Sequence, residues 1–185
     1  FINNTTFISN TAYSGAAVYR SGTGGKSLLV DSSQFIANYA GYQGGAFHNS
    51  GASLVVTNTL FARNTALNNG AAVYNANAAS TDLQMAYSTI VSPTTGVGAA
   101  ISHNYAASRV TITNSMVASY TTSIQHVTVG NIASDYNLFY NAPTAGVIGA
   151  HSITDAAPLF FDQASDNYRL QQGSPAINAG IAIAE

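Results

Sequence analysis

The chain has no cysteine and no tryptophan, and its charged residues are few. Of 185 residues, 5 are Lys or Arg and 7 are Asp or Glu, so charged side chains make up 6% of the sequence. Without cysteine, disulfides and thiolate metal sites are excluded. So few charges create no strong electrostatic field to attract nucleic acid or an anionic membrane, and we expect no nucleic-acid partner.

Long apolar runs are also missing. No run approaches the roughly 18 residues that a membrane helix needs, so we expect no membrane span. The first seven residues, FINNTTF, have no basic region or cleavage site, which places any secretion signal or anchor outside this sequence. The hydrophobic content of 46% is still enough for one continuous core. We therefore expect a single domain with a neutral surface rich in hydroxyls and amides.

Short apolar segments recur along the chain. In residues 35–57 there are three of them, which contain Phe35 and Asn38, Gly44 to Phe47, and Leu54 to Val56. Each is too short for a helix and fits a strand bounded by turn-forming residues. Three short strands in each repeat are typical of a solenoid coil.

Each of the three segments returns with a period of roughly 27 residues. The first recurs at Phe7–Asn10 and Phe61–Asn64, and more weakly at Ile90, Val117 and Phe139. The second begins at Gly15, Gly44, Gly70 and Gly98, with a degenerate copy at 123–125. The third recurs at Leu28–Val30, Leu83–Met85, Val110–Ile112 and Ile132–Ser134. One period shared by three independent segments is hard to attribute to chance.

These repeats predict an all-β fold, a right-handed parallel β-helix with three strands per coil and about five coils. The handedness follows the usual rule for parallel crossovers. Residues 1–145 would form the coils, and residues 146–185 a closing segment of the same domain. A leucine-rich-repeat horseshoe is the main rival, but no segment has helical periodicity and the repeated asparagine lies outside a leucine consensus.

Alternation within a strand predicts which side chains face the core. Leu83 and Met85 flank Gln84, so the outer two would be buried and Gln84 would face solvent. The same parity in the second segment buries Val18, Phe47, Val73, Ile101 and Ile124. It turns outward Ala17, Ala46, Ala72, Ala100 and Ser123, beside Tyr19, His48, Tyr74, Ser102 and Gln125.

The outward alanines and their aromatic neighbours form a candidate contact surface. A flat, uncharged strip of small residues suits close packing against another solenoid, a polysaccharide or ice. The alternative is that these alanines lie under a loop. Ice binding would favour regular threonine ladders on one flat face, which the sequence does not show.

Two further features predict structure at the bends. Asn10, Asn38 and Asn64 would form a ladder of stacked amides that bond along the helix axis. The glycines before the second segment suit a sharp corner that needs positive φ or little bulk.

Candidate catalytic groups do not converge in the sequence. Lyases and glycoside hydrolases need carboxylates on one face, as paired acids or as a calcium site. Asp31 follows the third segment, Asp82 precedes it, and the next acid at an equivalent place is Asp135, so neighbouring coils leave gaps. The four histidines are at non-equivalent positions of different coils, without a metal-binding spacing. We therefore expect no catalytic, cofactor or metal site, and lean against an enzyme.

Two parts of the chain resemble known families. The pairing of FxxN with GGA and an aliphatic residue, over about residues 1 to 105, resembles the repeats of bacterial surface β-helix proteins, including polymorphic outer-membrane-protein passengers. Residues 157–180, with APLF, DNYRL and GSPAINAG, are similar to the closing segment of secreted choice-of-anchor-type β-helix proteins, although Ala157 and Asn178 stand where those proteins usually have Asp. The resemblance implies an exported, surface-associated bacterial β-helix.

Three hypotheses of function follow. The first is an extracellular or cell-surface structural or adhesive protein, in the form of a filament subunit or with lateral self-association. The second is a carbohydrate-active enzyme, and the third is a carbohydrate- or ice-binding module. A polysaccharide is therefore a candidate partner.

The filament hypothesis starts from the register of the first residues. Phe1 and Ile2 align with Leu29 and Val30, so the sequence begins inside a third segment without a polar cap. If Phe1 is the mature N-terminus, a neighbouring subunit would cover this edge. Residues 177–183, which include Ile181 and Ile183, form an alternating uncharged stretch that could pair there as a strand and propagate a head-to-tail filament. The alternative is that further coils precede Phe1.

Overall fold

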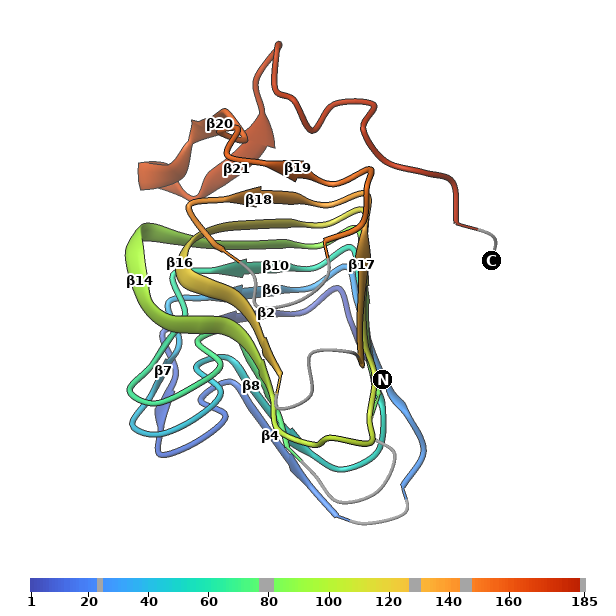
Figure 1. Cartoon of the computed structure of the whole chain (residues 1–185). Coiled ribbons are helices and arrows are strands. Elements are labelled where there is room, and N and C mark those ends of the chain that lie inside the picture. The colour runs from blue at the N-terminus through green and yellow to red at the C-terminus, as the bar shows by residue number, and fades with distance from the viewer. Residues whose placement is uncertain (23–24, 77–81, 127–130, 144–147, 184–185) are drawn as a thin grey trace.

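The computed structural model describes the chain except for residues 23–24, 77–81, 127–130, 144–147 and 184–185, and describes no side chains at 93–97. The described residues form a parallel β-helix, a β-solenoid in which the strands of successive coils stack side by side (Figure 1). They contain no α-helix, and one short 3-10 helix, η2 (Gln163–Ser165). The predicted fold class is confirmed.

The first sheet contains six parallel strands, one from each pass of the chain. In order they are β1 (Ile2–Asn3), β5 (Leu28–Asp31), β9 (Leu54–Thr57), β13 (Leu83–Ala86), β15 (Val110–Thr113) and β17 (Ile132–Asp135). Val56 pairs with Val30 on one side and with Met85 on the other, as the repeat predicts. Leu83 and Met85 are buried and Gln84 is exposed, so alternation holds in this sheet.

The second sheet meets the first at a short turn, and at its other end it continues around a corner into a third strip of strands. Its strands are β2 (Thr6–Ile8), β6 (Gln34–Ile36), β10 (Leu60–Ala62), β14 (Thr89–His103), β16 (Met116–His126), β18 (Leu138–Tyr140) and β19 (Ile153–Thr154). The third strip contains β4 (Val18–Ser21), β8 (Phe47–Ser50) and β12 (Val73–Asn75), and β12 pairs with the end of β14. Phe7, Phe35 and Phe61 stack in the core with ring centroids 4.9 Å apart.

A lobe projects from the first three coils between the second sheet and the third strip (Figure 1). It contains the three-stranded parallel sheet β3 (Thr11–Ala12), β7 (Tyr39–Ala40) and β11 (Thr65–Ala66). The next two passes have no such interruption, because β14 and β16 run through as strands of 15 and 11 residues. The lobe and the third strip therefore face each other only in the first part of the helix.

The alanines of the second segment face the core, and the predicted outward ladder is wrong. Ala46, Ala72 and Ala100 are fully buried in the same cluster as Phe47, and Ala17 packs against it. The reason is the corner, where the backbone amides of Ala46 and Phe47 both donate to the carbonyl of Ala72, at 3.2 and 2.9 Å. Two consecutive side chains then point inward, as at a β-bulge, and strict alternation does not apply.

The predicted asparagine ladder is confirmed. The side-chain amide of Asn10 donates to Asn38 Oδ1 at 2.8 Å, and that of Asn38 donates to Asn64 Oδ1 at 2.9 Å. The same oxygens accept the backbone amides of Asn10 and Asn38, both at 3.0 Å. Asn38 and Asn64 are fully buried, so these bonds satisfy turn groups that have no access to water.

A second polar ladder, which the sequence analysis missed, follows the turns between the first and second sheets. In this polar turn ladder each backbone amide donates to the side-chain oxygen at the same place in the next coil. Its members are Thr5, Ser33, Thr59, Ser88, Ser115, Asn137 and Ser152.

The C-terminal segment packs along the side of the helix. Strands β20 (Phe160–Asp162) and β21 (Asn167–Leu170) form an antiparallel hairpin, which buries Phe160 against Ile36, Ala62 and other outward residues of the second sheet. Arg63 and Asp166 form an ion pair between helix and hairpin. Residues 177–183 form no strand within this chain, and their pairing with the edge of another copy stays a prediction.

Candidate functional site

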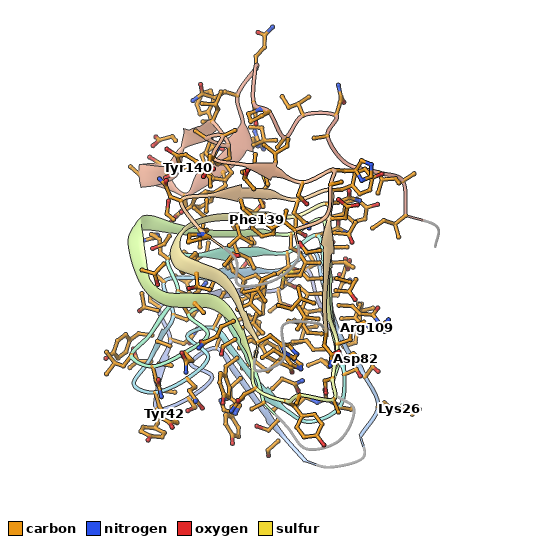
Figure 2. All side chains as sticks on the ribbon, viewed as in Figure 1. Lys26, Tyr42, Asp82, Arg109, Phe139 and Tyr140 are labelled. Atoms are coloured by element: carbon orange, nitrogen blue, oxygen red, sulfur yellow. The ribbon has the colours of Figure 1, made fainter. Side chains whose placement is uncertain are left out.

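A surface groove runs along the helix axis between the lobe and the third strip. Its open end has a volume of about 460 Å³ and is lined by Tyr13, Ser14, Tyr19, Tyr42, Gln43 and His48. Gln43 also lines a narrower inner end of about 130 Å³, together with Asn69, Tyr74, Ser102, His103, Asn104, Gln125 and His126. We call these two hollows, which share Gln43 in their linings, the tyrosine groove. Tyr42 lies at the outside of the lobe in Figure 2.

One side of the tyrosine groove is an aromatic ladder. Tyr19 pairs in register with His48, and His48 with Tyr74. The ring centroids are 4.7 Å apart in the first pair and 5.0 Å in the second. The sequence analysis singled out these three residues, and the structure brings them together. Only Tyr19 is largely exposed, at 56%, whereas His48 and Tyr74 are buried behind it.

The opposite side carries a second aromatic pair, which the sequence analysis missed. Tyr13 and Tyr42 stack with ring centroids 5.4 Å apart and planes 13° from parallel. Both are exposed, Tyr13 at 73% and Tyr42 at 40%. Each lies two residues before a corner glycine, Gly15 or Gly44, and this shared spacing was the available signal.

Glycine makes the corner that brings the two sides together. Gly44 has a φ of +68°, and a Cβ there would meet the carbonyl oxygen of Phe47 at 2.5 Å. Gly15 and Gly70 have the same conformation, as the sequence predicted. The chain can therefore reverse within a few residues, and Gln43 and His48 face the same groove from opposite sides.

The inner end of the groove rests on a ladder of amides and imidazoles. Asn49 donates to Asn75 Oδ1 at 2.6 Å, and the Asn75 amide lies 2.9 Å from His103 Nδ1. His103 stacks on His126 with centroids 4.7 Å apart and planes 9° from parallel. The expectation that all histidines lie at non-equivalent positions is wrong for this pair, because β14 and β16 pair these two residues in register.

The described lining of the groove includes no Asp, Glu, Lys or Arg side chain. Burial lowers the pKa of His48, and burial together with the charge of His126 lowers the pKa of His103 to about 4. A ligand of this groove would meet aromatic faces, amides and hydroxyls rather than charges.

Catalytic and metal-binding arrangements are not visible in the described part of the chain. No group of three or more His, Cys, Asp or Glu side chains there is placed to hold a metal ion. The contact of His151 Nδ1 with Asp135 Oδ2, at 2.8 Å, lies at the turn after β17, away from the groove. No helix among the described residues is long and apolar enough to cross a membrane.

The predicted assembly residues lie at separate places. Phe1 is 75% exposed and Ile2 is half-buried in β1, which among the described strands pairs with β5 alone. Ile181 and Ile183 are 43% and 42% exposed. The side chain of Asn114 bonds to both backbone groups of Ile181. Asn114 Oδ1 accepts the N–H of Ile181 at 2.9 Å, and Asn114 Nδ2 donates to the carbonyl of Ile181 at 2.7 Å. These bonds already occupy part of the segment that was predicted to pair with another chain.

Comparison of the chain with protein-family models finds no match, and comparison with curated proteins and with solved structures finds none either.

Proposed function

We propose that this chain is a non-enzymatic, extracellular adhesive β-solenoid that binds an uncharged polysaccharide in the tyrosine groove. The observation that carries the proposal is the placement of exposed tyrosine rings on both sides of a groove without acidic or basic residues in its described lining, with Tyr13 and Tyr42 stacked on one side and Tyr19 on the other. Aromatic rings offer large, rigid, apolar faces at a low entropic cost, and their hydroxyls remain available for hydrogen bonds. The C–H face of a sugar ring packs on such surfaces while its hydroxyls bond to neighbouring amides.

The dimensions of the groove suit an extended chain. The register runs from Tyr19 through His48, Tyr74 and Ser102 to Gln125, in four steps between adjacent strands. At about 4.8 Å per step this is roughly 19 Å, enough for several sugar units laid along the axis. Gln43, Asn69 and Asn104 line the same path and supply amide donors and acceptors for hydroxyl groups.

The chemistry of the lining favours binding over turnover. Glycoside hydrolysis needs two carboxyl groups, one on each side of the scissile bond, and the lining residues that the structure describes include none. The absence of charge in the lining also favours a neutral glycan over an acidic one. The resemblance of the repeats to bacterial surface β-helix proteins supports the extracellular, cell-surface part of the proposal.

The test is binding of soluble neutral polysaccharides, measured by affinity electrophoresis and calorimetry. We expect Tyr13→Ala combined with Tyr19→Ala to weaken binding tenfold to a hundredfold, because each stacking contact contributes about 0.5–1.5 kcal/mol beyond buried area. The affinity should change little between low and high salt, since no ion pair is involved.

The matched control is Tyr87→Ala, which removes another tyrosine, 45% exposed, that does not line the groove. This variant should bind as the unmodified chain does. Equal binding by the double variant, or binding that requires an acidic glycan and disappears in salt, would refute the proposal.

Self-association, head-to-tail or lateral, stays a prediction. Strands β1, β2 and β4 each pair on one side only, and Ile2, Phe7 and Val18 beside them are half-buried against the core. Such an edge accepts another strand, supplied by a second copy or by further coils of a longer chain.

A further inference from the structure

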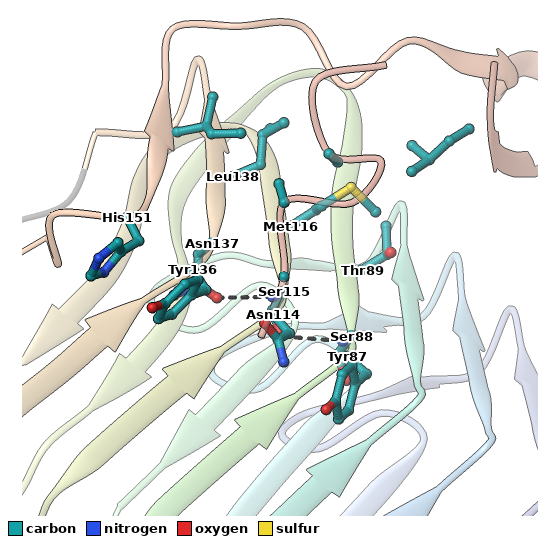
Figure 3. Close-up of a pocket in the computed structure, with 15 residues that line it drawn as sticks. Tyr87, Ser88, Thr89, Asn114, Ser115, Met116, Tyr136, Asn137, Leu138 and His151 are labelled. Atoms are coloured by element: carbon teal, nitrogen blue, oxygen red, sulfur yellow. Dashed lines mark hydrogen bonds between the residues drawn. The ribbon is translucent and has the colours of Figure 1, made fainter. Parts of the chain in front are cut away.

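A cavity lies between the polar turn ladder and the C-terminal arm, by which we mean residues 171–183 (Figure 3). Its volume is about 300 Å³. Apolar side chains supply most of its lining, from both the helix and the arm side. They include Met116, Leu138, Ile153, Leu170, Ala176 and Ala179.

The polar groups on the floor of this cavity are already bonded within the helix. Ser88 Oγ donates to the carbonyl of Ala86 at 3.0 Å and accepts the amide of Thr59 at 3.3 Å. Ser115 Oγ bonds in the same way with Thr113 and Ser88, and Asn137 Oδ1 accepts the amide of Ser115 at 2.9 Å. The floor therefore offers few further hydrogen bonds and acts as an apolar surface.

The rim of the cavity is made by three successive turn residues with positive φ. Tyr87, Asn114 and Tyr136 have φ values of 52°, 52° and 57°. The equivalent residues of earlier coils are Ser32 and Asn58, and Asn tolerates this conformation well. Tyrosine does not, and such strain costs on the order of 1–3 kcal/mol and concentrates at functional sites. Two aromatic rings are thus held beside the cavity against the local backbone preference.

The C-terminal arm is fastened across this rim by a specific clamp. The Asn114 amide bonds to both backbone groups of Ile181. The backbone amide of Ile183 also donates to the Tyr87 hydroxyl at 3.3 Å. On the other side, the His151 ring stacks on Tyr136 with centroids 4.5 Å apart and bonds to Asp135. The arm is therefore a fixed side of the cavity.

We propose that this cavity binds a small uncharged apolar ligand, about the size of one or two aromatic rings. A volume of 300 Å³ is at the lower end of ligand sites, and an apolar cavity of about 150 Å³ already accepts benzene. The internally bonded floor gives little to a polar ligand, and the arm leaves too little room for a protein segment. The site is separate from the tyrosine groove and does not depend on it.

The probe is indole, followed by ligand-observed NMR and calorimetry on the whole chain. We expect saturable binding that is lost in Ala179→Leu, because the larger side chain fills the cavity. Tyr87→Asn should weaken binding at least fivefold without unfolding the chain, since Asn occupies the same turn position in the coils before and after it. Tyr19→Ala should bind indole normally.

The clamp has its own matched pair of variants. Asn114→Ala should loosen the arm and weaken indole binding. Asn58→Ala places the same residue in the same turn conformation, but Asn58 bonds to Asp31 and not to the arm. Equal effects of these two variants, unchanged binding in Ala179→Leu, or no saturable indole binding at all would each overturn the proposal.

Discussion

The first three coils and the two that follow make the same turn of the helix in different ways. In the first three, the corner after the second sheet opens into the lobe, and Asn10, Asn38 and Asn64 occupy its base. In the next two, the chain passes the same corner within β14 and β16 and has no asparagine there. The buried amide is therefore what allows the backbone to leave the sheet, because it satisfies groups that the continuous strands satisfy by pairing. The open end of the tyrosine groove therefore depends on the lobe, which carries Tyr13 and Tyr42.

The largest expected effect comes from removing the side-chain amide of Asn38, the middle residue of the asparagine ladder. Asn38→Ala leaves the side chain of Asn10 and the backbone amide of Asn10 without their acceptor, and removes the donor to Asn64. We expect a loss of about 2–4 kcal/mol in the free energy of unfolding, because the fully buried Asn38 amide is removed together with its bonds to the carbonyl of Phe7 and to Asn64. Urea denaturation measures it.

The control is Asn10→Ala, at the exposed end of the same ladder. It should cost under about 1 kcal/mol, since water replaces the lost bond. If both variants lost the same stability, the ladder would not be what supports the lobe.

The later coils differ in a second respect. The ladder of Asn49 and Asn75 at the inner end of the groove continues in these coils as His103 and His126. The pKa of His103 is lowered from 6.5 to about 4 by burial and by His126. The folded state thus disfavours protonation, and its stability is full above pH 6.5 and falls as the pH drops from 6.5 to 4. The loss at pH 4 should reach roughly 3 kcal/mol, measured by urea denaturation across this range.

The control variant places in β14 the residue type, asparagine, that this ladder has in β8 and β12. His103→Asn keeps an acceptor for Asn75 and removes the titrating ring. It should flatten the dependence of stability on pH between 6.5 and 4. An unchanged slope in this variant would show that other groups cause it.

Sequence reasoning succeeded where the strand is straight and failed where it bends. Leu83, Gln84 and Met85 follow alternation because β13 is regular. Ala46 does not follow alternation. The amides of Ala46 and Phe47 share the carbonyl of Ala72 at the corner, so both side chains point inward. No residue pattern in the sequence predicts this arrangement.

The candidate site was only half predictable for the same reason. The ladder of Tyr19, His48 and Tyr74 follows from the repeat, whereas Tyr13 and Tyr42 lie in the lobe, where two-residue strands give no periodic signal. His103 and His126 were predictable, since the predicted pairing of Ile101 with Ile124 places them side by side. The polar turn ladder mixes Ser, Thr and Asn, so its members share a role but no residue type.

The edge of the helix and its interior should respond differently to the same charged substitution. Ile2 and Val30 are at equivalent positions of β1 and β5, but Ile2 is half-buried and Val30 is fully buried. Val30→Asp should prevent folding by burying an unpaired charge. Ile2→Asp should cost only about 1 kcal/mol, because the carboxylate reaches water at the edge.

Ile2→Asp then tests self-association without unfolding the chain. If a second copy pairs with β1, sedimentation should show larger species for the unmodified chain at high concentration and monomers for Ile2→Asp, because a charge at this edge opposes strand addition. The Gln84→Lys variant adds a charge on the exposed face of an inner coil and should leave the species unchanged. A monomeric unmodified chain at high concentration would rule out assembly through this edge, and equal loss in both variants would point to lateral contacts.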